Sequence, residues 1–206
     1  MKRFVLVGIL GWTLGAAPAT PAAGSKSTIE FGGLKWHQVN TDRFSVKDGW
    51  LILDKGRGWL RSDREYADFV LTIEWKFVDK GADSGIFVRT GAESGGGNGW
   101  PLKAIQIQCM DNDSLAGVFA AKEVTQATTR RTDLVKQLRK PTGELNVMEI
   151  RCEGKKMAVK LNGAVVTTCE NLVPAKGYIG IQGEGGTLHF KRIEIKELKS
   201  GGSNNG

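Results

Sequence analysis

The sequence predicts an all-β protein, a jelly-roll-like sandwich of two antiparallel sheets. From residue 44 onward, apolar residues alternate with polar ones, the period expected of strands with one buried face. Gly, Asn and Asp break this alternation roughly every eight to twelve residues, as tight turns between short strands would. The chain holds 28 glycines among 206 residues, about twice the usual share of ~7%. About a dozen strands without a repeat unit favour two packed sheets.

The expected strands follow one another along the chain, each bounded by a turn signal. Asn162-Gly163 is the strongest of these signals, because both residues tolerate the positive φ of a two-residue hairpin. A helical pattern appears at Asp133–Arg139 and spans about two turns. We expect strands at Phe44–Val46, Trp50–Leu53, Trp59–Arg61, Phe69–Val78, Ser84–Thr90, Ala104–Met110, Leu115–Ala121, Val147–Glu153, Met157–Leu161, Ala164–Cys169, Tyr178–Gln182 and Leu188–Glu197.

The first nineteen residues have the features of an export signal. Lys2 and Arg3 precede an uncharged, mostly apolar run, and Ala17 and Ala19 supply the small residues that a signal peptidase reads. The run is shorter than the ~20 residues of a membrane span. We therefore expect removal of residues 1–19, a periplasmic or secreted protein, and no membrane span. The remaining segments are a linker at 20–29, the sandwich at 30–198 and a disordered tail at 199–206.

The overall composition excludes several other classes of protein. A charged share of 25% is typical of a soluble globular chain and argues against disorder. The net charge of +7 raises the question of nucleic acid, but carboxylates lie close to the basic cluster, so we interpret it as a solvated loop and expect no nucleic-acid partner. That cluster consists of Arg130, Arg131, Lys136, Arg139 and Lys140.

The three cysteines are predicted to be buried thiols. The segment between Cys152 and Cys169 contains two tight turns, which place these residues on strands separated by a third strand. Strands two apart lie about 10 Å from each other, beyond the reach of a disulfide. No cysteine has a second Cys or a His at ligand spacing, so we expect no metal site, and we expect no cofactor.

Four strands carry polar residues opposite an apolar row. In Phe69–Val78 the polar row includes Glu74, and in Ser84–Thr90 it includes Arg89. Gln106 and Gln108 alternate with apolar residues in the next such strand, and Gln182 ends the last one. Gln offers a donor and an acceptor, as sugar hydroxyls require. We expect these rows to converge on one concave face that binds carbohydrate; a solvated sheet face is the alternative.

Several motifs in this order resemble the 3-keto-disaccharide hydrolase domain family, long catalogued as domain of unknown function 1080. They run from about residue 30 to residue 198 and comprise Trp59-Leu60-Arg61, Tyr66-Ala67-Asp68-Phe69, ADSGIFVRT (82–90), QIQCMD (106–111), PTGELN (141–146), LNG (161–163), PAKGYIGIQGEGG (174–186) and HFKRIEIKEL (189–198). The resemblance implies a concanavalin-like jelly roll that cleaves glycosides whose sugar carries a ketone at carbon 3.

Two positions depart from the pattern of this family. Its strand usually reads Glu-x-Gln-x-x-Asp, and here Gln106 replaces the Glu. The Trp that usually precedes the Asn is Leu145. The first departure argues against an acid–base role at position 106.

The candidate chemistry follows from the ketone. A conventional glycosidase needs two carboxylates, but the relevant strand offers only Asp111 beside its glutamines. A 3-keto sugar has an acidic proton on carbon 2, so one base and one oxyanion stabiliser suffice. We expect Glu74 as the base, with Asp111, His37 and His189 as the next candidates, and Arg89 as the stabiliser. The substrate-binding residues would be Gln106, Gln108, Asp111, Gln182 and Trp100.

Alternatives remain open for several of these residues. Glu74 and Arg89 could form a cross-strand ion pair on a solvated sheet, worth about 0.2–1 kcal/mol. The glycine-rich loop at 90–100 lacks the following helix of a phosphate site, so it is either a flap whose Trp100 stacks on a sugar or an ordinary hairpin loop. A non-catalytic carbohydrate-binding module on the same face is the rival function, and Gln106 favours it.

Overall fold

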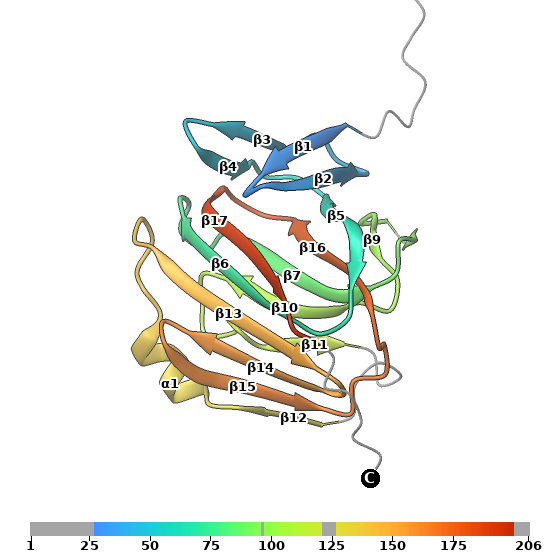
Figure 1. Ribbon diagram of the computed structural model, residues 1–206. Helices are drawn as coiled ribbons and strands as arrows, with labels where there is room; N and C mark the ends of the chain where they lie inside the picture. Colours follow the sequence, from blue (N-terminus) through green and yellow to red (C-terminus); the bar gives the residue numbers. More distant parts are fainter. Residues whose placement is uncertain (1–26, 96, 121–126, 200–206) are drawn as a thin grey trace, which may run out of the picture.

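The alternating segments form two antiparallel sheets in the computed structural model, which confirms the predicted fold class (Figure 1). The structure describes residues 27–95, 97–120 and 127–199. Sheet A has, in spatial order, strands β1 (Thr28–Phe31), β2 (Leu34–Val39), β5 (Gly58–Tyr66), β16 (Gly177–Gly183), β7 (Asp83–Thr90), β10 (Ile105–Met110) and β11 (Val118–Ala120).

The second large sheet, sheet B, packs against sheet A. Its strands are, in spatial order, β12 (Ala127–Arg130), β15 (Ala164–Glu170), β14 (Lys156–Leu161), β13 (Asn146–Glu153), β6 (Phe69–Phe77), β17 (Leu188–Glu197), β4 (Trp50–Leu53) and β3 (Phe44–Lys47). A short hairpin of β8 (Ser94–Gly95) and β9 (Trp100–Pro101) belongs to the loop after β7, and the helix α1 (Thr132–Leu138) follows β12.

The core between the sheets follows the predicted alternation. Along β6 every second residue is buried, and this row consists of Phe69, Leu71, Ile73, Trp75 and Phe77. Ile105 and Ile107 of β10 enter the same apolar cluster from the opposite sheet. Because neighbouring side chains of a strand point to opposite faces, the residues between these positions lie on the outer face of each sheet.

The sheets combine strands that are distant in the sequence. β6 and β7 follow one another along the chain but lie in different sheets, and Figure 1 shows them in separate layers. Late in the chain, β16 inserts between β5 and β7, and β17 inserts between β6 and β4. Sheet A therefore joins residues 98 positions apart, such as Ser84 and Gln182, whose hydroxyl and backbone carbonyl groups form a 2.7 Å hydrogen bond.

Some element boundaries differ from the sequence-based expectation. β1 begins at Thr28, inside the segment expected to be a linker, and β12 forms where no strand was expected. The helix expected at 133–139 is present at Thr132–Leu138. Among the residues that the structure describes, no helix is long and apolar enough to cross a membrane. The export signal at 1–19 and nearly all of the tail lie outside those residues, so these features stay predictions.

The cysteine prediction is confirmed. Cys109, Cys152 and Cys169 are buried and no disulfide joins them. Cys152 on β13 and Cys169 on β15 both pair with Met157 of β14, so a strand separates them as expected. Burial raises the pKa of Cys152 to about 12 and the pKa of Cys109 well above its usual range. Both of these groups are neutral thiols at physiological pH.

Candidate functional site

Three glutamines meet on the outer face of sheet A. Gln106 and Gln108 lie on β10, and Gln182 lies on the adjacent part of β16 beyond β7. The Gln106 amide nitrogen donates to the Gln108 side-chain oxygen at 2.7 Å and to the Gln182 side-chain oxygen at 3.0 Å. The sequence therefore predicted correctly that these three residues share one face.

A glycine forms the floor beneath these amides. Gly85 of β7 lies between Gln108 of β10 and the end of β16. A Cβ at position 85 would lie 2.5 Å from the Gln106 amide nitrogen and 2.7 Å from the Gln182 side-chain oxygen. The missing side chain therefore leaves the space that the amide chain occupies.

The amide chain ends on a carboxylate, Asp83. The Gln108 amide nitrogen donates to Asp83 Oδ1 at 2.6 Å, which fixes one carboxylate oxygen. Asp83 begins β7, pairs with Met110, and forms a backbone bridge with Gly185. Burial raises the pKa of Asp83, and the backbone N–H of Ser84 opposes this shift only in part.

A second carboxylate, Glu184, follows Gln182 by two residues. Burial is the first cause that raises the pKa of Glu184, and the negative charge of Asp83 is the second. The guanidinium of Arg57 opposes the shift. The site thus holds two carboxylates whose pKa values are both raised, chiefly by burial.

Neither carboxylate was among the expected site residues. Asp83 belongs to the ADSGIFVRT segment and Glu184 to the GIQGEGG segment, so both lay within motifs that carried the family resemblance. Asp83 is the first residue of its strand and Glu184 comes just after the end of its own, so alternation within a strand could not assign them to a face.

The loop after β7 covers part of this outer face. The Trp59 indole N–H donates to Ser94 Oγ at 3.0 Å. The rings of Trp59 and Phe87 pack edge to face, with 5.9 Å between their centroids. The Trp100 indole N–H donates to the backbone oxygen of Gly183 at 3.1 Å, which places Trp100 beside Glu184. Trp100 remains partly exposed, so its predicted contact with a sugar stays a proposal.

This loop is tied to the sheet at its glycine-rich tip. The Arg57 guanidinium donates to the Gly97 oxygen at 3.4 Å, and the Asn40 amide donates to the Gly99 oxygen at 3.1 Å. The backbone N–H of Gly58 donates to the Asn98 oxygen at 3.2 Å. The expected flap is therefore anchored over the first residues of β5.

Glu74 does not lie with the glutamines, so the predicted convergence of all four polar rows is wrong. Glu74 is on β6 in sheet B and points to the outer face of that sheet. Its carboxylate is 3.9 Å from Lys191 Nζ, and its backbone neighbours are Val147 and Arg192. The apolar core of the sandwich separates it from Gln106.

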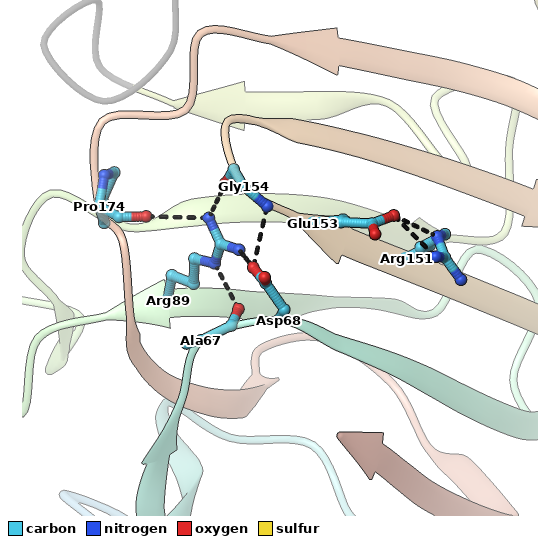
Figure 2. A network of polar contacts seen from close by, with 7 residues as sticks. All are labelled: Ala67, Asp68, Arg89, Arg151, Glu153, Gly154 and Pro174. Atoms are coloured by element: carbon cyan, nitrogen blue, oxygen red, sulfur yellow. Dashed lines mark hydrogen bonds and ion pairs between the residues drawn. The ribbon is translucent and has the colours of Figure 1, made fainter. Parts of the chain in front are cut away.

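Arg89 lies on β7 in sheet A, but its side chain is buried and bound within the protein (Figure 2). Its Nε donates to the Ala67 oxygen at 2.8 Å, and one terminal nitrogen donates to the oxygens of Gly154 at 2.6 Å and Pro174 at 3.1 Å. The other terminal nitrogen forms a 2.9 Å ion pair with Asp68. These contacts join three loops and leave the guanidinium with no exposed surface for an enolate.

The side chains of the remaining candidates bind groups other than the amide chain. The Asp111 carboxylate accepts hydrogen bonds from Arg139 at 2.9 Å and from the Thr142 hydroxyl at 2.8 Å. His37 is bound to Asp63 at 2.7 Å, and the His189 ring packs against Trp50 in sheet B at 6.0 Å. The three expected substrate-binding glutamines are thus linked to Asp83, whose charge also raises the pKa of Glu184, and not to the expected acid–base residues.

Comparisons with known proteins identify the family of the chain. The sequence matches the 3-keto-alpha-glucoside-1,2-lyase-like domain over residues 28–196. The chain belongs to this family. This match confirms the resemblance seen in the sequence. Both carboxylates and all three glutamines lie within the matched residues. No curated protein matches the chain in sequence.

Solved structures share the fold of this family member. A protein from Parabacteroides distasonis ATCC 8503, provisionally assigned as a glycosyl hydrolase, has a TM-score of 0.62 and 17% identity, over 80% of this chain and 88% of its own. Bacillus licheniformis beta-glucanase has a TM-score of 0.54 and 12% identity, over 85% and 100%. The carbohydrate-binding module CBM66 from Bacillus subtilis has a TM-score of 0.53 and 13% identity, over 81% and 96%.

The family match indicates a 3-keto-alpha-glucoside-1,2-lyase-like domain, and the solved structures show that its fold is a jelly roll. The outer face of sheet A suits such a role chemically. Amides supply donors and acceptors for hydroxyl groups, and a coupled pair of carboxylates can give and take protons.

Proposed function

We propose that this family member cleaves the glycosidic bond of 3-keto sugars on the outer face of sheet A. The observation that carries the proposal is the pair of carboxylates with raised pKa values, Asp83 and Glu184, beside the three linked glutamines. Perturbed carboxylates that lie next to convergent polar groups are typical of sites that transfer protons.

Asp83 is the proposed base. Gln108 orients one of its carboxylate oxygens, and the role requires Asp83 to be ionised while Glu184 holds a proton. The C2–H bond of the 3-keto sugar breaks, its proton goes to Asp83, and its electron pair moves toward the C3 oxygen. A raised pKa makes a carboxylate a stronger base than an exposed aspartate.

The Gln108 amide is the proposed stabiliser of the enolate oxygen. It has a second N–H besides the one bound to Asp83. Gln182 is buried and its side-chain oxygen accepts from Gln106, so Gln182 positions the chain of amides and does not contact the sugar. Fixed amide donors at the developing negative charge lower the barrier, because they need no reorganisation during the step.

Glu184 is the proposed acid. When the enolate returns its electrons, the bond between C1 and the leaving oxygen breaks, and protonated Glu184 gives its proton to that oxygen. The sugar leaves as an unsaturated ketone. Addition of water, with hydroxyl to C1 and a proton to C2, gives the free 3-keto sugar, so elimination alone is a lyase reaction and both steps together are hydrolysis.

The test compares release of nitrophenol from a nitrophenyl 3-keto-glucoside and from its unoxidised parent. We expect release only from the oxidised compound. Asp83→Asn should lower kcat by about 10²–10⁴-fold, the usual contribution of a general base. Nitrophenolate leaves without a proton, so the acid is tested on a 3-keto-disaccharide, on which Glu184→Gln should lower kcat by about 10²–10⁴-fold. Glu74→Gln is the matched control, because it removes a carboxylate from the outer face of the opposite sheet and should leave kcat unchanged. A loss confined to the Glu74→Gln variant would overturn the assignment.

The second candidate function is carbohydrate binding without catalysis. It is favoured by Gln106, which replaces the Glu of the usual family pattern, and by the shared fold with CBM66. Wild-type protein that binds the 3-keto-glucoside but releases no nitrophenol, under conditions where Asp83→Asn and Glu184→Gln bind equally well, would support this candidate.

A further inference from the structure

A polar cavity lies between α1 and the loop that follows β10. We call it the α1 pocket; its volume is about 710 Å³, within the range of about 300–1,000 Å³ that is typical of small-molecule sites. Its charged lining residues are Lys80, Lys136, Arg139, Lys140, Asp111 and Asp113. Four cationic groups therefore face two carboxylates.

One of the two carboxylates, Asp111, is occupied by hydrogen bonds from the protein itself. Asp111 accepts hydrogen bonds from Arg139, from the Thr142 hydroxyl and from the backbone N–H of Gly81 at 3.1 Å. Only 4% of its side chain is exposed. Asp111 thus orients Arg139 and Thr142 and presents little negative charge to a ligand.

The cationic side chains of the α1 pocket still have N–H groups that can bind an anion. Arg139 uses one terminal nitrogen for Asp111, so its other N–H groups are available, and 29% of its side chain is exposed. Lys136 lies 3.7 Å from Asp113, and both side chains are more than half exposed, a setting in which an ion pair contributes about 0–1 kcal/mol. Among the described residues, no carboxylate lies within ion-pair distance of Lys80 or Lys140.

The backbone around these cations is fixed. The N–H of Lys140 donates to Asn146 Oδ1 at 3.0 Å, and the Asn162 amide donates to the Leu138 oxygen at 2.7 Å at the end of α1. The N–H of Glu144 closes a turn on the Pro141 oxygen at 3.0 Å. A pocket with a preformed backbone loses less entropy on binding than a flexible loop does.

We propose that the α1 pocket binds the anionic substituent of a saccharide, a carboxylate or a sulfate ester. The cations supply the charge, while the Thr142 hydroxyl keeps lone pairs for a sugar hydroxyl after donating to Asp111. The pocket adjoins the proposed active face, because the N–H of Asp111 donates to the Ala82 oxygen at 2.9 Å, next to Asp83. The choice of a saccharide rests on the proposed function.

The test is an NMR titration of ¹⁵N-labelled protein with glucuronate, glucose 6-sulfate, glucose and inorganic sulfate. None of these compounds is a 3-keto glycoside, so the outcome is independent of turnover. We expect shifts of the amides of residues 111–114, 139, 140 and 142, and at least tenfold tighter binding of one anionic sugar than of glucose. The tighter of the two anionic sugars identifies the substituent as carboxylate or sulfate.

Two double variants separate a built pocket from the general attraction of a basic protein. Lys80→Gln/Lys140→Gln should weaken binding of the anionic sugar at least tenfold. Lys47→Gln/Lys196→Gln removes the same charge from exposed positions of sheet B and should change binding less than twofold. Equal losses in both variants, or no preference for anionic sugars, would overturn the pocket. Inorganic sulfate that binds as tightly as glucose 6-sulfate would overturn its preference for a saccharide.

Discussion

The Arg89 guanidinium joins parts of the chain that are far apart in the sequence. Its partners lie in the β5–β6 turn, the β13–β14 turn and the loop before β16 (Figure 2). The side chain has no exposed surface, so these partners replace all the water that the charge loses on folding. Asp68, its charged partner, also accepts the N–H of Gly154 at 2.9 Å, which ties the same turn a second time.

We predict that Arg89→Ala destabilises the protein by about 3 kcal/mol or more. The substitution removes a donor from Asp68 and from three carbonyl oxygens, and the loss of one partner of a buried pair costs about 3–5 kcal/mol. Arg89→Lys should rescue little, because an ammonium group cannot reproduce the planar fork of donors.

Urea denaturation gives the measurement for Arg89. Arg192→Ala is the control, since Arg192 is exposed and its ion pair with Glu194 lies on the surface, where such pairs contribute about 0–1 kcal/mol. Unfolding midpoints of Arg89→Ala and wild type that coincide would show that the network adds no stability.

Two strands of sheet A contain a glycine at a position where a side chain would collide with a neighbouring residue. On β7, Gly85 leaves space for the ends of Gln106 and Gln182, which are flexible amide groups. On β16, a Cβ at Gly180 would lie 2.5 Å from a ring carbon of Trp59, a side chain that is fully buried. The same substitution should therefore have different results at the two positions.

We predict that Gly85→Ala weakens binding of the 3-keto sugar at least tenfold and changes stability little, because the amides move away from the new methyl group. Gly180→Ala should instead lower the free energy of unfolding by about 1–3 kcal/mol, the usual cost of overpacking a rigid core. Thermal unfolding together with a sugar-binding titration distinguishes the two effects. The opposite pattern, with Gly85→Ala the less stable variant, would contradict the proposed floor of the site.

Sequence alternation predicted the faces of single strands well, because burial depends on the local period of two. The buried row of β6 and the shared outer face of Gln106 and Gln108 both follow from it. It could not assign strands to sheets, since β6 and β7 alternate alike and differ only in their distant pairing partners. The error in placing Glu74 comes from this missing information.

At the scale of the whole molecule, charge and burial distinguish sites from structural contacts. Arg89 was expected at the site from its place on a polar row, yet its positive φ of 46° shows that the end of β7 departs from regular strand geometry. Asp83 and Glu184 are brought near each other by the pairing of β7 with β16, which the sequence does not reveal. Fold class depends on patterns along the chain, whereas the site depends on pairings across it.

The carboxylate pair also links the site to the stability of the whole protein. The pKa values of Asp83 and Glu184 are raised above their usual values of 3.8 and 4.5, chiefly by burial. A raised pKa means that the folded state holds the proton more tightly than the unfolded chain. The stabilisation is therefore fully present below the usual values, and it is lost as pH rises through the raised ones.

We predict that the double variant Asp83→Asn/Glu184→Gln is more thermostable than wild type at pH 7, because it removes two charges that burial disfavours. The difference in Tm should shrink as pH falls from 7 and should be smallest below pH 3.8. Other carboxylates act in the opposite direction, since bonds to His37 and Arg64 lower the pKa values of Asp63 and Glu197. The difference between variant and wild type cancels their effect, because both proteins contain them. A difference that stays constant from pH 3 to 7 would show that Asp83 and Glu184 ionise as they do in an unfolded chain, and Glu184 could then not serve as the acid.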